Sequence, residues 1–142
     1  MTKQSVQRPF AGTIDRLRGV GLRPTRQRLA LARLLLDGGD RHVTAEALHL
    51  ETQEAGFKIS LATIYNTLHQ FTQAGLLREV VVEPGRSYFD TNVRDHHHFF
   101  FADNGSLQDI PGDQVAMSVI PDAPDGTEID RVDVIVRLRA PK

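Results

Sequence analysis

Apolar residues recur at helical spacing through the first half of the chain and predict four helices. Phe10, Ile14 and Leu17 share the face of a first helix, because they are four and then three residues apart. Each later helix is expected to begin after a hydroxyl side chain, which can accept a hydrogen bond from a free backbone N–H of the first turn. Glycines that follow the apolar runs are expected to end these helices. The expected N-caps are Thr25, Thr44 and Ser60, and the helix ends are expected near Gly38, Gly56 and Gly75.

The pattern then changes to one typical of strands. Residues 76–83 are rich in valine and leucine, the Pro-Gly pair at 84–85 predicts a turn, and residues 86–90 are expected to return as a second strand. This order of elements, helices and then a two-stranded hairpin, is typical of a winged helix-turn-helix. We therefore predict an α+β fold, in which residues 1–90 form an N-terminal winged-helix DNA-binding domain.

The second half is predicted to be a small α/β domain after a polar hinge at residues 91–95. A strand is expected at 96–102, a turn at the Asn-Gly pair 104–105 and a returning strand at 107–110. A short helix is expected at 114–119, and alternating valines predict a last strand at 132–138. Residues 96–142 are too few to bury a good core alone. We expect them to pair with a second copy, as a dimerisation and ligand-sensing domain of a homodimer.

Composition excludes several classes of protein. The 142 residues are 40% hydrophobic, which is typical of a folded chain and not of a disordered one. Cysteine is absent, which excludes disulfides, thiolate metal sites and cysteine nucleophiles. No apolar run has the length of a signal peptide core or a membrane span, so we expect a cytoplasmic protein without a membrane partner.

Charge is distributed unevenly along the chain. Residues 1–41 contain nine Lys or Arg against three Asp or Glu, whereas residues 91–142 contain five against nine. A basic segment in a chain of formal net charge −1 favours an anionic partner, and nucleic acid is the usual one. An ordinary solvated basic surface is the alternative.

The helix after Ser60 is the candidate recognition helix. Its apolar arc includes Ile64 and Leu68, and the opposite arc, which includes Thr67 and Gln70, carries uncharged side chains that can approach base edges. Residues near the start of such a helix should lie deepest in the major groove of double-stranded promoter DNA. Arginines elsewhere suit phosphates or a narrow minor groove. The predicted DNA-contacting residues are Arg23, Arg26, Arg28, Ser60, Thr63, Tyr65, Asn66 and Arg86.

Three consecutive histidines, His96, His97 and His98, are the sharpest chemical feature of the sequence. Alternate side chains of a strand share a face, so His96 and His98 should point together and His97 away from them. Two imidazoles on one face can chelate a metal ion. With His42 and Asp90, they form a candidate ligand set suited to Zn, Fe(II), Mn(II) or Co(II). An ion there would tie the two halves of the chain together and act as a switch.

The histidine run also supports two other hypotheses. His96, His97 or His98 could ligate haem, with the phenylalanines at 99–101 as apolar surface for the porphyrin, although dimer core also explains these phenylalanines. A non-haem iron enzyme with two histidines and a carboxylate is the third hypothesis. It needs an open coordination position in a roomy pocket, whereas the first half is helical and the remainder is too short for a barrel. The sequence also offers no nucleophile–base pair. We therefore expect no enzymatic activity.

Several segments resemble the ferric uptake regulator (Fur) family over residues 19–106. They are residues 41–46 (RHVTAE), 60–65 (SLATIY), 70–76 (QFTQAGL) and the histidine run. The resemblance implies a dimeric, winged-helix, metal-responsive transcription regulator. It places the tyrosine of the family's recognition helix on Tyr65. It places the hinge-site ligands of the family on His42, Asp90, His96 and His98, with His97 as the alternative to His96.

The chain also departs from the family pattern. Many members hold a structural zinc ion with two C-x-x-C pairs, and the absence of cysteine excludes that four-cysteine zinc site here. Asn66 stands where arginine is common, and Val132 stands near a histidine of a further family metal site. The cysteine-free sequence with its DHHHFF run most resembles the iron response regulator (Irr) branch. That likeness implies haem-responsive control of iron uptake and haem synthesis genes. The alternative is a regulator that senses a bare Mn, Fe or Zn ion.

Overall fold

The computed structural model describes residues 11–142, so the predicted face residue Phe10 lies outside the described part. The chain divides into two compact units, Met1–Val93 and Arg94–Lys142, with the boundary inside the segment predicted as a hinge. Within the described residues, four α-helices and two three-stranded sheets confirm the predicted α+β class. None of the helices described is long and apolar enough to cross a membrane.

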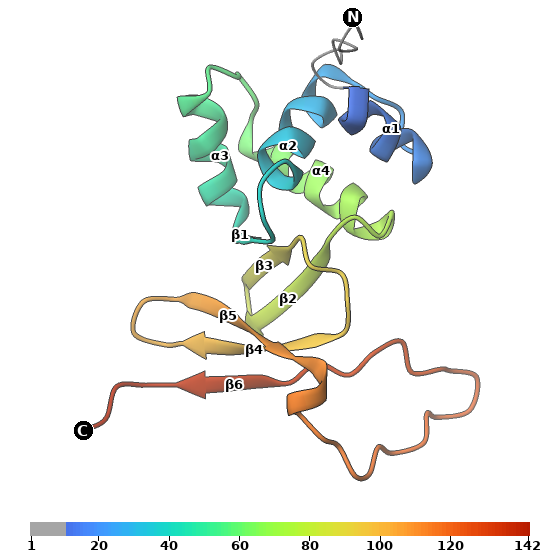
Figure 1. The fold of residues 1–142 in the computed structure, drawn as a ribbon, viewed down its shortest axis with the longest axis vertical. Helices are drawn as coiled ribbons and strands as arrows, with labels where there is room; N and C mark the ends of the chain where they lie inside the picture. Colours follow the sequence, from blue (N-terminus) through green and yellow to red (C-terminus); the bar gives the residue numbers. More distant parts are fainter. Residues whose placement is uncertain (1–10) are drawn as a thin grey trace, which may run out of the picture. The chain divides into compact units, whose positions relative to one another are not determined.

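The helices belong to the first unit (Figure 1). They are α1 (Ala11–Gly19), α2 (Arg26–Leu36), α3 (Ala45–Glu54) and α4 (Leu61–Gln73). All three predicted N-caps are confirmed, because Thr25, Thr44 and Ser60 each accept a hydrogen bond from the backbone N–H three residues later. Gly56 and Gly75 follow α3 and α4 at φ of 82° and 84°, a conformation that glycine adopts without strain.

The apolar faces of these helices share one core. Phe71 and Leu68 of α4 pack in it with leucines from the other three helices, and all are fully buried. The placement of Thr67 on the polar face was wrong, because Thr67 is buried and donates to the carbonyl of Thr63 at 2.8 Å. Thr67 lies at the edge of the apolar arc, and this local hydrogen bond satisfies its hydroxyl there.

A small sheet of order β1-β3-β2 completes the first unit. Strands β2 (Arg78–Glu83) and β3 (Arg86–Asp90) form the predicted hairpin, with Gly85 at φ 76° in its turn. Strand β1 (His42–Val43) was not predicted, because two residues are too few for a periodic pattern. It pairs antiparallel with β3 and places His42 opposite Asp90.

The second unit has a sheet of order β5-β4-β6 (Figure 1). Strands β4 (His96–Phe101) and β5 (Ser106–Pro111) form the predicted hairpin, and β6 (Ile135–Leu138) pairs parallel with β4. The predicted strand at 132–138 is therefore shorter than expected. The predicted helix at 114–119 was wrong, because the structure there has a 3-10 turn at Gly112–Gln114 and then irregular chain. Two β-branched residues before Pro121 explain the failure, since that sequence disfavours helix.

Removal of the α3 cap gives a first prediction. Thr44→Ala is expected to lower the free energy of unfolding by about 1 kcal/mol, because Thr44 Oγ1 accepts the Ala47 N–H at 3.1 Å. Thr44→Ser keeps the hydroxyl and should keep most of the stability. Urea unfolding followed by far-UV circular dichroism measures both variants. Equal losses in the two variants would show that the cap contributes nothing.

Candidate metal centre and nucleic-acid interface

In the first unit, His42 and Asp90 form a histidine–carboxylate pair. The register of β1 and β3 sets them opposite each other, with His42 Nε2 3.3 Å from Asp90 Oδ2. Asp90 is fully buried, and its Oδ1 accepts the backbone N–H of Asn92 at 2.9 Å. A buried carboxylate needs such partners, since an isolated buried charge is costly. The pair offers a cation one imidazole nitrogen and one carboxylate oxygen.

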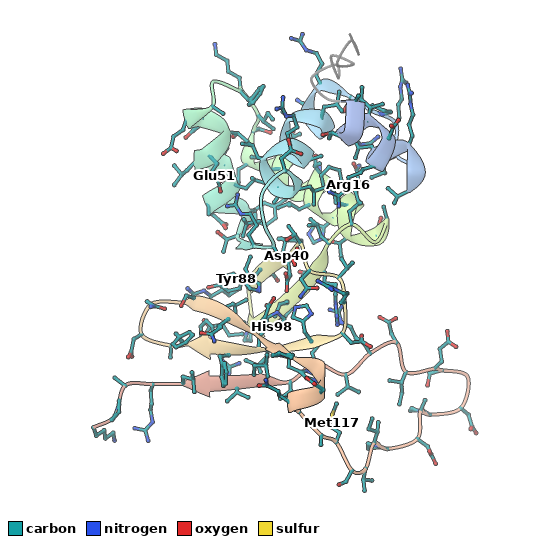
Figure 2. All side chains as sticks on the ribbon, viewed as in Figure 1. Arg16, Asp40, Glu51, Tyr88, His98 and Met117 are labelled. Carbon is teal, nitrogen blue, oxygen red and sulfur yellow. The ribbon has the colours of Figure 1, made fainter. Side chains whose placement is uncertain are left out.

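Arg41 fixes the strand that carries His42. Its backbone N–H donates to Thr91 Oγ1 at 2.8 Å, and its carbonyl accepts the Thr91 N–H at 3.1 Å. Its guanidinium donates to both carboxylate oxygens of Glu51 on α3, at 2.8 and 2.6 Å; Glu51 is labelled in Figure 2. The hydrogen bond to Glu51 is the largest cause of the raised pKa of Arg41. The residue before His42 is therefore tied to α3 and to the end of β3.

In the second unit, His96, His98 and Asp109 lie together on one face of the β4–β5 hairpin. The predicted alternation places His96 and His98 side by side, with ring centroids 4.6 Å apart (His98 is labelled in Figure 2). Asp109 Oδ1 lies 3.5 Å from His96 Nε2 and 3.4 Å from His98 Nε2. Each of the three offers a possible ligand atom within 4.8 Å of the others.

The tautomer of His96 favours metal binding at Nε2. Its Nδ1 is hydrogen-bonded to the backbone carbonyl of Arg94. A carbonyl oxygen only accepts, so Nδ1 is the donor of this bond, and Nε2 is the ring nitrogen that lies beside Asp109. Metal-binding histidines commonly have an outer partner of this kind, which fixes the ring and its tautomer.

Sequence reasoning missed Asp109, which lies on β5 opposite His98. No sequence pattern around Asp109 marks it as a candidate metal ligand. The Asn-Gly turn could have placed Asp109 on the face of His96 and His98 but not at its observed register, because a two-strand hairpin pairs residues symmetrically about its turn. Counting outward from residues 104–105 pairs residue 109 with residue 100, whereas the observed four-residue turn at 102–105 sets it opposite residue 98.

His97 has a different role from its neighbours. It is buried, and its Nδ1 accepts the backbone N–H of Val134 at 3.1 Å. The bond links β4 to the residue before β6, so it holds the sheet of the second unit together. The face shared with Asp109 carries His96 and His98, not His97.

The donors present fit a divalent transition-metal ion. The second unit offers two imidazole nitrogens and a carboxylate, and the first unit offers one of each. Imidazole with carboxylate suits Mn, Fe(II) and Zn, whereas an all-oxygen set would suit Mg or Ca. The carboxylates also compensate the charge of a dication, which makes burial of the ion less costly.

The start of α4 presents several of the predicted DNA-contacting residues. Ser60 Oγ accepts the Thr63 N–H at 3.1 Å and donates to Thr63 Oγ1 at 2.9 Å, so both hydroxyls belong to the helix cap. Tyr65 is 37% exposed, and its hydroxyl donates to Glu46 Oε1 of α3 at 2.5 Å. Asn66 is exposed.

Two of the predicted arginines have partners within the first unit. Arg28 donates through Nε and Nη2 to Gln70 Oε1 at 3.3 and 3.0 Å, which joins α2 to α4. Arg86 pairs with Glu83 at 3.2 Å, and this hydrogen bond is the largest cause of its raised pKa. The exposed members of the predicted set are Arg23, Arg26, Ser60, Tyr65, Asn66 and Arg86.

Known proteins resemble the chain in sequence and in fold. Residues 19–125 match the sequence model of the ferric uptake regulator family. The chain is 34% identical over 100 residues to the ferric uptake regulation protein of Shigella flexneri, which covers 70% of this chain and 68% of that protein. It is 32% identical over 107 residues to the peroxide-responsive repressor PerR of Staphylococcus aureus (strain Mu50), covering 75% and 72%. The structure of the ferric uptake regulator from Pseudomonas aeruginosa with manganese has a similar fold (TM-score 0.66, 24% identity, 90% and 97% coverage).

Proposed function

The chain belongs to the ferric uptake regulator family, and we propose that it controls promoters in response to a bare divalent metal ion. The observation that carries the proposal is the cluster of His96, His98 and Asp109. Its two imidazoles and one carboxylate are the donors that Mn(II), Fe(II) and Zn(II) accept. The related regulator from Pseudomonas aeruginosa was solved with manganese.

We propose that His42 and Asp90 complete the ligand set of the same ion. The polar segment 91–95 connects Asp90 to His96, so a short stretch of chain joins the two groups of ligands. An ion that recruits both groups would favour one arrangement of the two units over others. Metal occupancy would then shift the population that binds DNA, because the ion has a higher affinity for that arrangement.

The first unit would provide the DNA-binding surface as a winged helix. Helix α4 would enter the major groove, and the arginines would contact phosphates. The second unit would pair with a second copy, so that a homodimer reads two related half-sites. Such a regulator would act in the cytoplasm and needs no catalytic activity. The proposed DNA contacts are Arg23, Arg26, Arg28, Ser60, Thr63, Tyr65, Asn66 and Arg86.

Haem is the alternative signal, as an Irr-like regulator of iron uptake and haem synthesis genes would require. It is supported by the cysteine-free sequence and by the phenylalanines at 99–101, of which Phe100 is buried. The bare ion is preferred because His96 and His98 already share a carboxylate partner. An axial haem ligand also needs an accessible imidazole, and His97 is buried with its Nδ1 hydrogen-bonded.

Titration of the metal-free protein with Mn(II) and, separately, with ferric haem tests this function. The DNA probe is a duplex that the Mn(II)-treated protein selects from a random library. We expect saturable Mn(II) binding that changes DNA affinity by about 5- to 150-fold, the range typical of coupled sites. A haem Soret shift that is lost in a His96→Ala/His97→Ala/His98→Ala variant, with a matching change in DNA affinity, would favour the haem alternative. A protein that selects no duplex in any ligand state would contradict the regulatory function.

A further inference from the structure

The hydroxyl of Tyr65 is directed to a neighbouring helix. Tyr65 is the fifth residue of α4, and its hydroxyl donates a hydrogen bond at 2.5 Å to Oε1 of Glu46, the second residue of α3. The hydrogen bond therefore spans the two helices of the proposed helix-turn-helix. Both side chains are exposed, so the bond lies on the surface and contributes little to core stability.

The shared proton stays on the tyrosine. The bond from Tyr65 is the largest cause of the lowered pKa of Glu46, and a bond from the Glu46 backbone N–H is the next. The same bond raises the pKa of Tyr65. Glu46 lies in the first turn of α3, where the helix dipole favours a negative charge. At neutral pH the phenol therefore donates to Glu46, and this proton is not available to a phosphate or a base.

A carboxylate at this place is unfavourable for DNA affinity. It repels phosphates, and it does so whatever the base sequence of the DNA. A contribution of Glu46 to DNA recognition therefore has to act through Tyr65, apart from the stabilisation of α3 by its charge. A free tyrosine side chain loses rotamer freedom when DNA binds, whereas a side chain held in place beforehand loses less.

We propose that Glu46 is a positioning residue for DNA recognition, which holds the Tyr65 ring in its base-contacting orientation with the hydroxyl turned toward α3. This inference rests on the proposed DNA-binding function. The tether acts only where the ring meets bases, so it raises affinity for the operator over other DNA. The charge of Glu46 acts on all DNA alike. The ratio of operator affinity to affinity for a scrambled duplex therefore isolates the tether.

Four variants of the full chain test the proposal on the duplex selected by the wild type. Glu46→Ala and Tyr65→Phe each remove the tether, and each should lower the affinity ratio by about 2- to 12-fold. The double variant should show the loss of one single variant and not the product of both, because the two residues act through one bond. Glu46→Gln keeps an acceptor without the charge, so it should retain the ratio while absolute affinity rises on both duplexes. Glu54→Ala is the matched control, since it removes an exposed carboxylate from the end of the same helix.

The outcomes distinguish a failure of this inference from a failure of the proposed DNA-binding function. A wild type that selects no duplex overturns the proposed function and the inference with it. A selective wild type whose ratio survives Glu46→Ala, or whose single-variant losses multiply in the double variant, overturns the inference alone. Should Glu46→Ala fold poorly by circular dichroism, Tyr65→Phe and Glu46→Gln decide the question. A lower affinity ratio in Tyr65→Phe together with an unchanged ratio in Glu46→Gln supports the tether, and any other result contradicts it.

Discussion

Replacing His98 by alanine should weaken Mn(II) binding by more than about 100-fold. Losing an outer partner of a metal ligand already costs about 10- to 100-fold in affinity, and His98 is proposed to bind the ion directly. It is buried in the second unit's cluster, with its Nε2 3.4 Å from Asp109 Oδ1 and its ring beside that of His96. Alanine would leave that unit with one imidazole and one carboxylate for the ion. Metal-dependent operator binding should disappear with the affinity.

Thermodynamic linkage gives an independent measure of the same loss. At a Mn(II) concentration 100 times the wild-type Kd, the bound ion stabilises the protein by about 2.7 kcal/mol. A 100-fold weaker Kd would reduce this to about 0.4 kcal/mol. Urea unfolding with and without Mn(II) measures both values, and His49→Ala on α3 is the control for loss of an imidazole. If His98→Ala bound Mn(II) as tightly as the wild type, the ion would have to use other residues.

Local chemistry explains which helices could be predicted. The N-caps at Thr25, Thr44 and Ser60 depend only on a hydroxyl and a backbone N–H three residues away, so the sequence carries them directly. Strand β1 depends on pairing with β3, which lies far along the chain, and it has too few residues for a pattern. The prediction of a helix at 114–119 was wrong because it used apolar spacing alone. That spacing does not account for β-branched residues before proline, which disfavour helix formation.

The same distinction holds for the site. The alternation of a strand was enough to place His96 and His98 on one face and His97 on the other. Asp109 required the hairpin register in addition, and the bond between Tyr65 and Glu46 required the packing of α3 on α4. These contacts join residues that are distant in sequence, and helical or strand periodicity carries no information on such pairs.

Replacing Phe71 by alanine should lower the free energy of unfolding of the first unit by about 3–5 kcal/mol. Phe71 is fully buried on α4, so truncation loses apolar burial and leaves a cavity in the core that four helices share. Domains of this kind have about 5–15 kcal/mol of stability in total, so the variant would lose a large part of it. Urea unfolding of the metal-free protein, followed by far-UV circular dichroism, measures the loss without a contribution from bound ion.

Phe57→Ala is the matched control for that experiment. Phe57 follows α3 and is 40% exposed, so its truncation should cost about 1 kcal/mol or less. A large loss confined to Phe71→Ala would show that the buried face of α4 anchors the helical core. Recognition would then depend on Phe71 only through stability, and operator selectivity of the folded fraction should be unchanged. Equal losses of unfolding free energy in the two variants would instead mean that the core does not centre on α4. The buried face of α4 would then not explain how Tyr65 is held in place.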